Sequence, residues 1–492
     1  MSASVTVVPT PEVMAKYEVV IGLEVHCQLA TKTKIFCGCP TIFGAPPNTC
    51  VCPVCLGLPG ALPVLSRQAV ELGIRASLAL NCEVRPQSIF ARKNYFYPDL
   101  PKGYQISQYD KPLAEHGWVD IELEGVHKRI GITRVHLEDD AGKSIHDGFK
   151  DSDRYTYVDL NRSGTPLAEI VGEPDLRSPE EAYAFVTEMK LILQFAGVST
   201  CDMEKGHLRC DANVSVMRKG ADKFGEKVEI KNLNSFRFLK LALEHEIERQ
   251  IGVIESGGHI VQETRLYNPD TGETASMRSK EDAHDYRYFP EPDLVPLRVS
   301  EDWRNRIKAE MPELPPARRK RMLEDYRLRE YDAQVLMQTR ELSDFYERVA
   351  STAGDPRAAA NWVMGDLMGW LKAESKEITE SPIKPEDLGD LIALIGKGEI
   401  SGKIAKDVFG KMVEGGESAR TIIEREGLRQ ISDTGALEKI VDEVLAANPK
   451  QVEQYKGGKT TVIGFLVGQI MKASRGQANP AAVNELLKTR LS

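Results

Sequence analysis

The chain has 492 residues, of which 41% are hydrophobic and 28% are charged, and its formal net charge at pH 7 is −9. This length suggests roughly three domains. No run of about 18 apolar residues occurs, which argues against a membrane span. Met1–Lys16 lacks the basic-then-apolar pattern of a secretory signal, so we expect a cytoplasmic protein. The negative charge argues against a surface coated with phosphate-binding residues, although a basic field can still be local.

The two parts of the chain differ in expected secondary structure. Residues from about 17 to 295 read as strands and turns with a few helices, whereas residues from about 300 to 492 read as helices. Strands followed by helices indicate an α+β fold and then all-α domains. We expect an antiparallel-sheet cradle domain over residues 1–296, with a zinc knob formed by the paired cysteines between Cys37 and Cys55. A helical domain over 297–380 and a small helical tail domain over 381–492 should follow.

Polar residues alternate with apolar ones in the expected strands. The first strand, residues 19–28, places Glu24 and His26 on its polar face, and residues 132–140 place Glu138 on another. Such alternation suits antiparallel strands with one wet face. A merely solvated face would favour Lys, Thr and Glu, whereas these strands carry ligand-type residues. Two carboxylates and one imidazole predict a Mg²⁺ site with positions left for water and phosphate oxygens.

Five of the nine cysteines lie close together after the first strand. Two tight pairs, Cys37 with Cys39 and Cys52 with Cys55, have the spacing of a structural zinc site. Disulfides are the alternative, but a large chain without a signal peptide favours metal binding. Cys50 is a competing fourth ligand. The other cysteines are expected to be packed thiols: Cys27, Cys82, Cys201 and Cys210.

Two lysines flank a segment rich in aromatic and proline residues. Lys93 precedes this segment and Lys102 follows it. The pattern suggests an ordered loop that presents cations to a phosphate or acyl group. The alternative is a surface turn with solvated lysines.

Three further polar segments could contact a nucleotide or RNA, or could equally form buried polar networks. The first contains Asp159, Asn161 and Arg162 ahead of a turn with glycine and proline. The second contains Asn232, and the third, rich in charged and aromatic residues, contains Arg278. Residues around Asn232 and from Arg278 to Arg287 are therefore candidates for binding a cofactor.

Several common motifs are missing, and the positive charge is uneven. The sequences around Lys143 and Lys459 lack the first glycine of a P-loop, and there is no HExxH or GxSxG motif. Residues 445–492 contain seven basic and two acidic residues, which points weakly to RNA or DNA. The basic cluster 318–321 is either a solvated helix start or a phosphate contact.

Together these segments resemble the family of B subunits of the aspartyl/glutamyl-tRNA amidotransferases (GatB). The matching stretches run in order along nearly the whole chain: 20–26, 36–39, 52–60, 93–105, 136–143, 159–171 and 457–479. The resemblance implies an enzyme that uses ATP and Mg²⁺ to phosphorylate the side-chain carboxylate of Glu-tRNA(Gln) or Asp-tRNA(Asn). Ammonia would then displace the phosphate.

The resemblance also implies roles for the candidate residues. Glu24, His26 and Glu138 would hold Mg²⁺, and Lys93 and Lys102 would lie near the ammonia path or the activated acyl group. The zinc knob would help to place the acceptor end of the tRNA. Its ligands would be Cys37, Cys39, Cys52 and Cys55.

The expected partners follow from the same resemblance. The chain contains no amidase signature, so ammonia would come from an amidase, the A subunit of a heterotrimer, and a small C subunit would hold the two together. The basic tail would bind the tRNA body. Two other hypotheses stay open. A non-catalytic zinc-containing tRNA-binding scaffold would not need Glu24, His26 and Glu138. A freestanding ATP-dependent ligase would need its own ammonia source.

Overall fold

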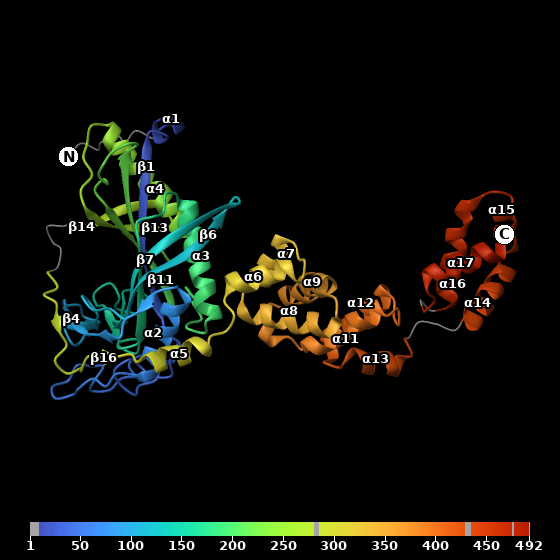
Figure 1. Cartoon of the computed structure of the whole chain (residues 1–492), viewed down its shortest axis with the longest axis horizontal. Helices are drawn as coiled ribbons and strands as arrows, with labels where there is room; N and C mark the ends of the chain where they lie inside the picture. The colour runs from blue at the N-terminus through green and yellow to red at the C-terminus, as the bar shows by residue number, and fades with distance from the viewer. Residues whose placement is uncertain (1–8, 280–284, 429–433, 475–476, 492) are drawn as a thin grey trace. The chain divides into compact units, whose positions relative to one another are not determined.

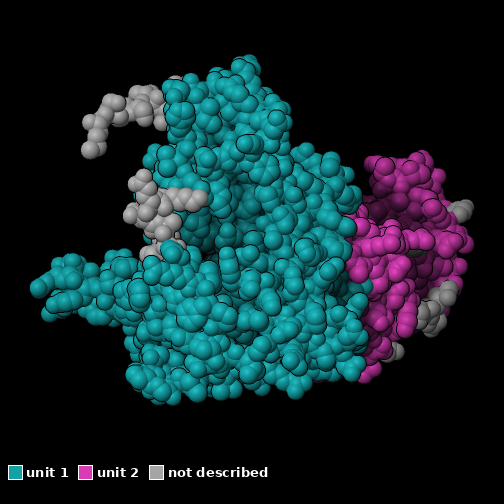
Figure 2. Space-filling view, turned by 60° about the vertical axis from the view of Figure 1, so that its left-hand side comes forward, with its two compact units in different colours: residues 1–315 teal, residues 316–492 magenta. Residues whose placement is uncertain are grey.

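The structure, a computed structural model, describes residues 9–279, 285–428, 434–474 and 477–491. The chain divides into two compact units, residues 1–315 and 316–492, which Figure 2 shows in different colours. The first unit is built around a large sheet, and the second is built from helices.

Among the described residues, nine strands form the main sheet of the first unit. They are β1 (Tyr17–Gln28), β2 (Glu83–Val84), β6 (Ala114–Leu123), β7 (Val126–Asp139), β10 (Pro166–Gly172), β11 (Leu208–Arg218), β12 (Val228–Lys231), β13 (Glu263–Asn268) and β14 (Glu273–Ser279). Their order is β14-β13-β12-β11-β1-β10-β7-β6-β2, and every neighbouring pair except β12–β13 is antiparallel. The predicted antiparallel sheet is therefore confirmed apart from one parallel pair. That pair is joined by the long helix α4 (Phe236–Glu255), a crossover that returns the chain in the same direction.

Three small sheets border the main one. β15 (Phe289–Pro290) pairs with β4 (Ala91–Asn94), which pairs with β5 (Tyr104–Ser107). The other two sheets join β16 (Leu297–Arg298) to β3 (Gln87–Ser88), and β8 (Lys143–Ile145) to β9 (Tyr157–Asp159). The β15-β4-β5 sheet brings the residues just before β15 next to the segment that lies between Lys93 and Lys102.

Helices pack on the apolar side of the main sheet (Figure 1). α2 (Arg67–Ala79), α3 (Pro179–Phe195) and α4 begin at serine N-caps, whose hydroxyls accept backbone N–H groups of the first turn. Along β1, Leu23 and Val25 are buried in the core, whereas the alternate residues Glu24 and His26 are only partly buried. The helices therefore cover the apolar face of the sheet and leave uncovered the polar face that carries Glu24 and His26. The short helix α1 (Pro11–Met14) precedes β1.

The chain after β16 still belongs to the first unit. α5 (Glu301–Ala309) contacts α2, and Trp303 Nε1 donates a hydrogen bond to Glu71 Oε1 at 3.0 Å. Ile307 lies in the same core as the sheet. The proposed division into three domains stays a prediction.

The described residues of the second unit form two separate hydrophobic cores. The first core lies within residues 322–423 and the second within residues 437–491. The helices around the first are α6 (Pro315–Glu324), α7 (Glu330–Leu336), α8 (Arg340–Ala353), α9 (Pro356–Trp362), η2 (Val363–Leu367), α10 (Met368–Ala373), η3 (Ile378–Glu380), α11 (Pro385–Gly396), α12 (Gly402–Gly415) and α13 (Ala419–Glu426). Those around the second are α14 (Thr434–Ala447), α15 (Pro449–Lys456), η4 (Thr460–Val462), α16 (Ile463–Ala473) and α17 (Pro480–Leu491). Among the helices in the described ranges, none combines the length and apolarity that crossing a bilayer requires.

Candidate functional site

A row of polar residues crosses four neighbouring strands of the main sheet. Arg209 of β11 lies opposite His26 of β1. His26 lies opposite Glu169 of β10, which lies opposite His136 of β7. Glu138, two residues after His136 on β7, shares its face. The register of the sheet therefore gathers residues that are far apart in the sequence.

Three of these side chains could hold one metal ion. Donor atoms of His26, Glu138 and Glu169 lie within 4.8 Å of one another. His26 Nδ1 is 3.3 Å from Glu138 Oε1 and 3.9 Å from Glu169 Oε2. Glu138 and Glu169 are buried, with 2% and 7% exposure. Two buried carboxylates this close to each other are unfavourable unless a cation neutralises them. Together with the imidazole they form a donor set that fits a divalent ion.

The two carboxylates favour the protonated, positively charged form of His26. Burial alone would lower the pKa of His26, but its hydrogen bond with Glu138 and the charge of Glu169 raise this pKa to about 9. Burial would raise the pKa of Glu169, but the charge and hydrogen bond of His136, 3.2 Å away, hold it well below its usual range. A metal cation bound here would have to displace the proton of His26, because a metal ligand must be deprotonated.

Glu24, named in the predicted Mg²⁺ set, does not join this group. Its carboxylate accepts a hydrogen bond from Asn213 Nδ2 at 3.0 Å, and its neighbour on β10 is the apolar Val171. Sequence reasoning gave no role to Glu169, which instead completes the group. The available signal was a single acidic residue between Ala168 and Ile170 in a buried strand, because glutamate is rarely buried without a partner.

Lys93, in β4, faces the same acidic group. Burial lowers the pKa of Lys93, but the charges of Glu138 and Glu169 outweigh this effect and raise it. Its Nζ lies 4.9 Å from the centre of the Tyr286 ring, a cation–π distance. More tyrosines extend this aromatic wall through ring contacts: Tyr95, Tyr288 and Tyr109. The geometry therefore combines carboxylates, an imidazole, a lysine and aromatic rings.

Lys102 is engaged in a buried ion pair. Its ammonium group contacts the carboxylate of Asp139, which also accepts the backbone N–H of Ile106 at 2.7 Å. Burial raises the pKa of Asp139, and Lys102 opposes this rise only in part. The backbone of Lys102 also packs against Gly57, where an added Cβ would lie 2.9 Å from the Lys102 Cα. Lys102 thus links the end of β7 to the cysteine loop.

The first group of predicted cofactor residues makes contacts within the protein. Asp159 Oδ1 accepts the backbone N–H of Asn48, and Asn161 Oδ1 accepts that of Cys50 at 2.8 Å. Arg162 Nε donates to the carbonyl of Ala141 at 3.1 Å. Asp159 and Asn161 hold the cysteine loop, and Arg162 holds the loop after β7. A role for any of them in nucleotide binding stays a prediction.

The other two residues predicted to bind a cofactor, Asn232 and Arg278, lie toward the β14 end of the main sheet. Asn232 has a left-handed backbone with φ 68°, a region that asparagine tolerates, and its Nδ2 donates to the carbonyl of Tyr267 at 2.9 Å. Arg278 lies in β14 opposite Thr264. The side chain of Arg278 lies outside the described part of the chain.

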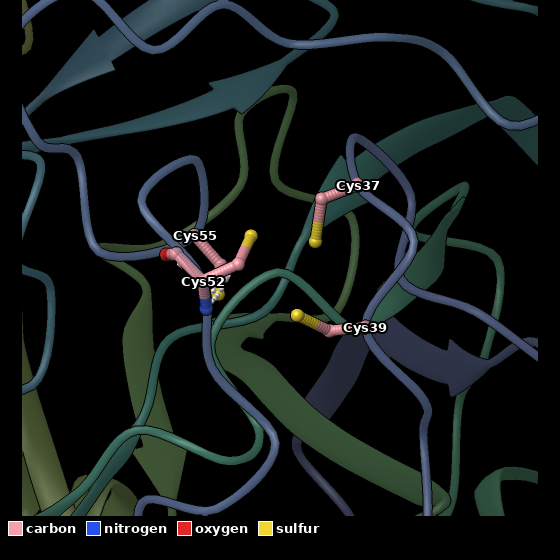
Figure 3. A group of neighbouring side chains, drawn as sticks. All are labelled: Cys37, Cys39, Cys52 and Cys55. Carbon is pink, nitrogen blue, oxygen red and sulfur yellow. Dashed lines mark hydrogen bonds between the residues drawn. The ribbon is translucent and has the colours of Figure 1, made fainter.

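Four cysteine thiols converge in the loops after β1 (Figure 3). Their sulfur atoms lie within 4.8 Å of one another, and Cys52 Sγ and Cys55 Sγ are 3.9 Å apart. Zn–S bonds of about 2.3 Å in a tetrahedron place two sulfurs about 3.8 Å apart, so the spacing fits a metal site. The converging residues are Cys37, Cys39, Cys52 and Cys55. Cys50, the competing ligand, is buried and does not join this group.

The thiols differ strongly in acidity because they are so close. A hydrogen bond from Cys37 is the main cause that lowers the pKa of Cys55 to about 4, helped by the backbone N–H of Cys52 and by Lys34. The same hydrogen bond raises the pKa of Cys37 far above its usual value. These contacts favour the thiolate form of Cys55, which is the form in which cysteine binds a metal.

The basic cluster at the start of the second unit is largely engaged. Arg318 donates to Ser343 Oγ at 3.0 Å and to Asp344 Oδ1 at 2.6 Å. Arg321 pairs with Glu347 at 2.5 Å. These contacts join α6 to α8. The observed geometry thus supports a packing role for this cluster.

Comparisons with known proteins agree along nearly the whole chain. A family described as "GatB/GatE catalytic domain" matches residues 19–305, and one described as "GatB domain" matches residues 344–491. The chain is 57% identical over 479 residues to the B subunit of the aspartyl/glutamyl-tRNA(Asn/Gln) amidotransferase of Carboxydothermus hydrogenoformans, covering 97% of this chain and 100% of the relative. The protein of the same name from Geotalea daltonii is 58% identical over 476 residues, covering 97% and 99%. That from Geobacillus kaustophilus is 56% identical over 471 residues, covering 96% and 98%.

Proposed function

Because the chain belongs to the family of B subunits of the aspartyl/glutamyl-tRNA(Asn/Gln) amidotransferases, we propose that it activates and amidates aminoacyl-tRNA with ATP. The substrates are Glu-tRNA(Gln), Asp-tRNA(Asn) or both. The products are Gln-tRNA(Gln) and Asn-tRNA(Asn). This substrate implies a cytoplasmic location, which stays a prediction.

The first step makes the side-chain carboxylate reactive. A carboxylate oxygen attacks the γ-phosphorus of ATP, the bond to the bridging oxygen breaks, and ADP leaves with the electron pair. Mg²⁺ held by His26, Glu138 and Glu169 would neutralise charge on the transferring phosphoryl group. Lys93 places a further positive charge beside these acids, where it can contact phosphoryl or carboxylate oxygens.

The second step forms the amide. Ammonia attacks the acyl carbon, the bond from this carbon to the phosphate oxygen breaks, and phosphate leaves with the electron pair and one proton from nitrogen. We assign the release of ammonia from glutamine to a partner amidase, the A subunit, with a small C subunit completing the assembly. Lys102 is held near the acidic site by Asp139, consistent with a role beside the ammonia path or the acyl group.

The cysteine site has a structural role in this proposal. Zinc fits its four thiols in number and spacing. The loop it would stabilise contacts Lys102 through Gly57 and the segment of Asp159 to Arg162 through hydrogen bonds, so it can position the acceptor end of the tRNA near the acidic group. The basic tail would contact the tRNA body.

The His26, Glu138 and Glu169 group is the observation that carries the proposal. The test is ATP hydrolysis by the chain with its A and C subunits, with and without Glu-tRNA(Gln). Glu138→Gln removes one charge from the group, and Glu122→Gln, an exposed carboxylate of the same sheet, is the matched control. We expect turnover that depends on charged tRNA, is lost in Glu138→Gln and is kept in Glu122→Gln.

The same experiment separates the alternative function. A non-catalytic zinc-containing tRNA-binding scaffold predicts tight tRNA binding without tRNA-dependent ATP turnover in the unmodified chain. It also predicts that Glu138→Gln changes nothing. Either result would overturn the catalytic proposal.

A further inference from the structure

Lys34 is a fully buried lysine beside the cysteine site. Its exposure is 0%, and it is among the largest completely buried side chains of the described residues. Its Nζ lies 3.5 Å from Cys55 Sγ and 3.4 Å from the carbonyl oxygen of Leu160. Its backbone N–H donates to the carbonyl of Cys39 at 2.9 Å. Lys34 therefore contacts both cysteine pairs, one through its backbone and the other through its side chain.

The buried ammonium group has an unusual set of partners. Within the described ranges, no carboxylate forms an ion pair with Lys34, and its ammonium group donates hydrogen bonds to the Cys55 sulfur and to the Leu160 carbonyl. A buried charge is unfavourable unless it is paired and hydrogen-bonded. The Cys55 sulfur, which is a thiolate whenever it binds a metal, can supply the opposite charge.

The charge of a metal-bound cysteine site calls for such a cation. Four thiolates around a divalent ion carry a net charge of −2, which is also unfavourable inside a protein. One ammonium group in contact with a ligand sulfur offsets half of this charge and donates a hydrogen bond to it. Groups that contact metal ligands in this way tune the affinity of the site.

The surroundings of Lys34 connect the cysteine site to the catalytic sheet. Ser163 Oγ donates to the carbonyl of Cys55 at 3.3 Å, and Gly164 N–H donates to the carbonyl of Asp140 at 2.9 Å. Gly164 has φ 86°, and a Cβ there would lie 3.4 Å from Lys34 Cδ and 3.5 Å from Cys55 Cβ. This close packing fixes the lysine between the thiol and the segment that enters β10.

We propose that Lys34 is a positioning residue for the cysteine metal site: it neutralises and orients the Cys55 thiolate and ties the site to the segment before β10. The inference rests on the proposed metal role of the cysteines and not on catalysis. It predicts that removal of the lysine charge weakens metal binding while all four ligands remain.

The first test measures metal affinity of the full chain with Co²⁺ as the probe. The intensity of thiolate-to-Co²⁺ absorption reports binding, and competition with a chelator gives relative affinities. Lys34→Met should weaken binding about 10–100-fold, the range typical of residues that contact metal ligands. The exposed neighbour variant Lys32→Met should bind like the unmodified chain. Equal affinity in Lys34→Met and Lys32→Met would overturn the proposal.

The second test works even if Lys34→Met folds poorly. In Co²⁺-loaded protein, where the cysteine ligands are thiolates, Cys55→Ser leaves Lys34 without its anionic partner, so its melting temperature should fall. Adding Lys34→Met should then recover much of that fall. Cys39→Ser is the matched control, because the lysine side chain does not contact this thiol, and Lys34→Met should not rescue it. Rescue of neither variant, or of both equally, would overturn the proposal.

Neither readout involves tRNA or ATP, so failure here is distinct from failure of the proposed activity. If the chain shows no tRNA-dependent ATP turnover but Lys34→Met weakens Co²⁺ binding as expected, the proposed activity fails and the role of Lys34 is still supported. The absence of any Co²⁺ binding in the unmodified chain would remove the metal role of the cysteines and this proposal with it.

Discussion

The acidic group around His26 can be tested through the stability of the metal-free chain. The pKa of His26 rises from 6.5 to about 9 in the folded structure. At about 1.4 kcal/mol per pH unit, this difference corresponds to about 3 kcal/mol of stabilisation by the protonated ring. The figure is an upper limit, because 21% of the side chain stays exposed to solvent.

The sign of the effect follows from the direction of the change. Because the pKa is higher in the folded chain, the folded state holds the proton more tightly than the unfolded state. The stabilisation is complete below pH 6.5, declines between pH 6.5 and about 9, and is lost at higher pH. Replacement of His26 by asparagine abolishes this contribution at every pH.

Urea unfolding in the presence of a chelator measures the effect. Trp118 and Trp303 report on the first unit if Trp362 and Trp370 of the second are replaced by phenylalanine. The difference in free energy of unfolding between this protein and its His26→Asn variant should shrink by up to about 3 kcal/mol from about pH 6 to about pH 9.5. A difference that does not change with pH would refute the idea that Glu138 and Glu169 hold a protonated His26.

The acidic group of His26, Glu138 and Glu169 and the cysteine loop give three more predictions. Glu169→Gln should lower Mn²⁺ affinity, measured by electron paramagnetic resonance, and tRNA-dependent ATP turnover by at least about tenfold, because it removes a carboxylate of the group. Glu24→Gln should keep most of the Mn²⁺ binding, and equal losses would contradict the assignment. Gly57→Ala should reduce the free energy of unfolding by about 1–3 kcal/mol, since φ is +67° and the Cβ would press on Lys102; an unchanged value would contradict this reasoning. Cys50→Ser should leave the metal content unchanged by atomic absorption, whereas loss of the metal would make this thiol a ligand.

Local sequence patterns predicted the faces of single strands and the meeting of the two cysteine pairs. Alternation over residues 19–28 and 132–140 matches β1 and β7, because each strand buries one face and leaves the other polar. The two cysteine pairs come together as their spacing suggested, because each pair lies in one short loop.

Contacts between distant segments were not visible in these patterns. Alternation shows which face a side chain occupies, but it does not show which strand lies next to it. Glu24 and His26 share a face of β1, yet only His26 has an acidic neighbour on β10. Lys34 gave no signal at all, because a lysine in a loop is ordinarily exposed and its burial depends on the segment before β10.

The apolar core also determines the geometry of the acidic site. The side chains of β1, β7 and β10 alternate between the two faces, so a slip of one residue would move His26, His136 or Glu169 to the wrong side. Burial of the intervening residues, including Leu137 and Ile170, opposes such a slip and fixes the register. The irregularity in the β7–β10 pairing comes only after Val171, beyond the polar row. The site therefore depends on hydrophobic packing on the opposite face of the same strands.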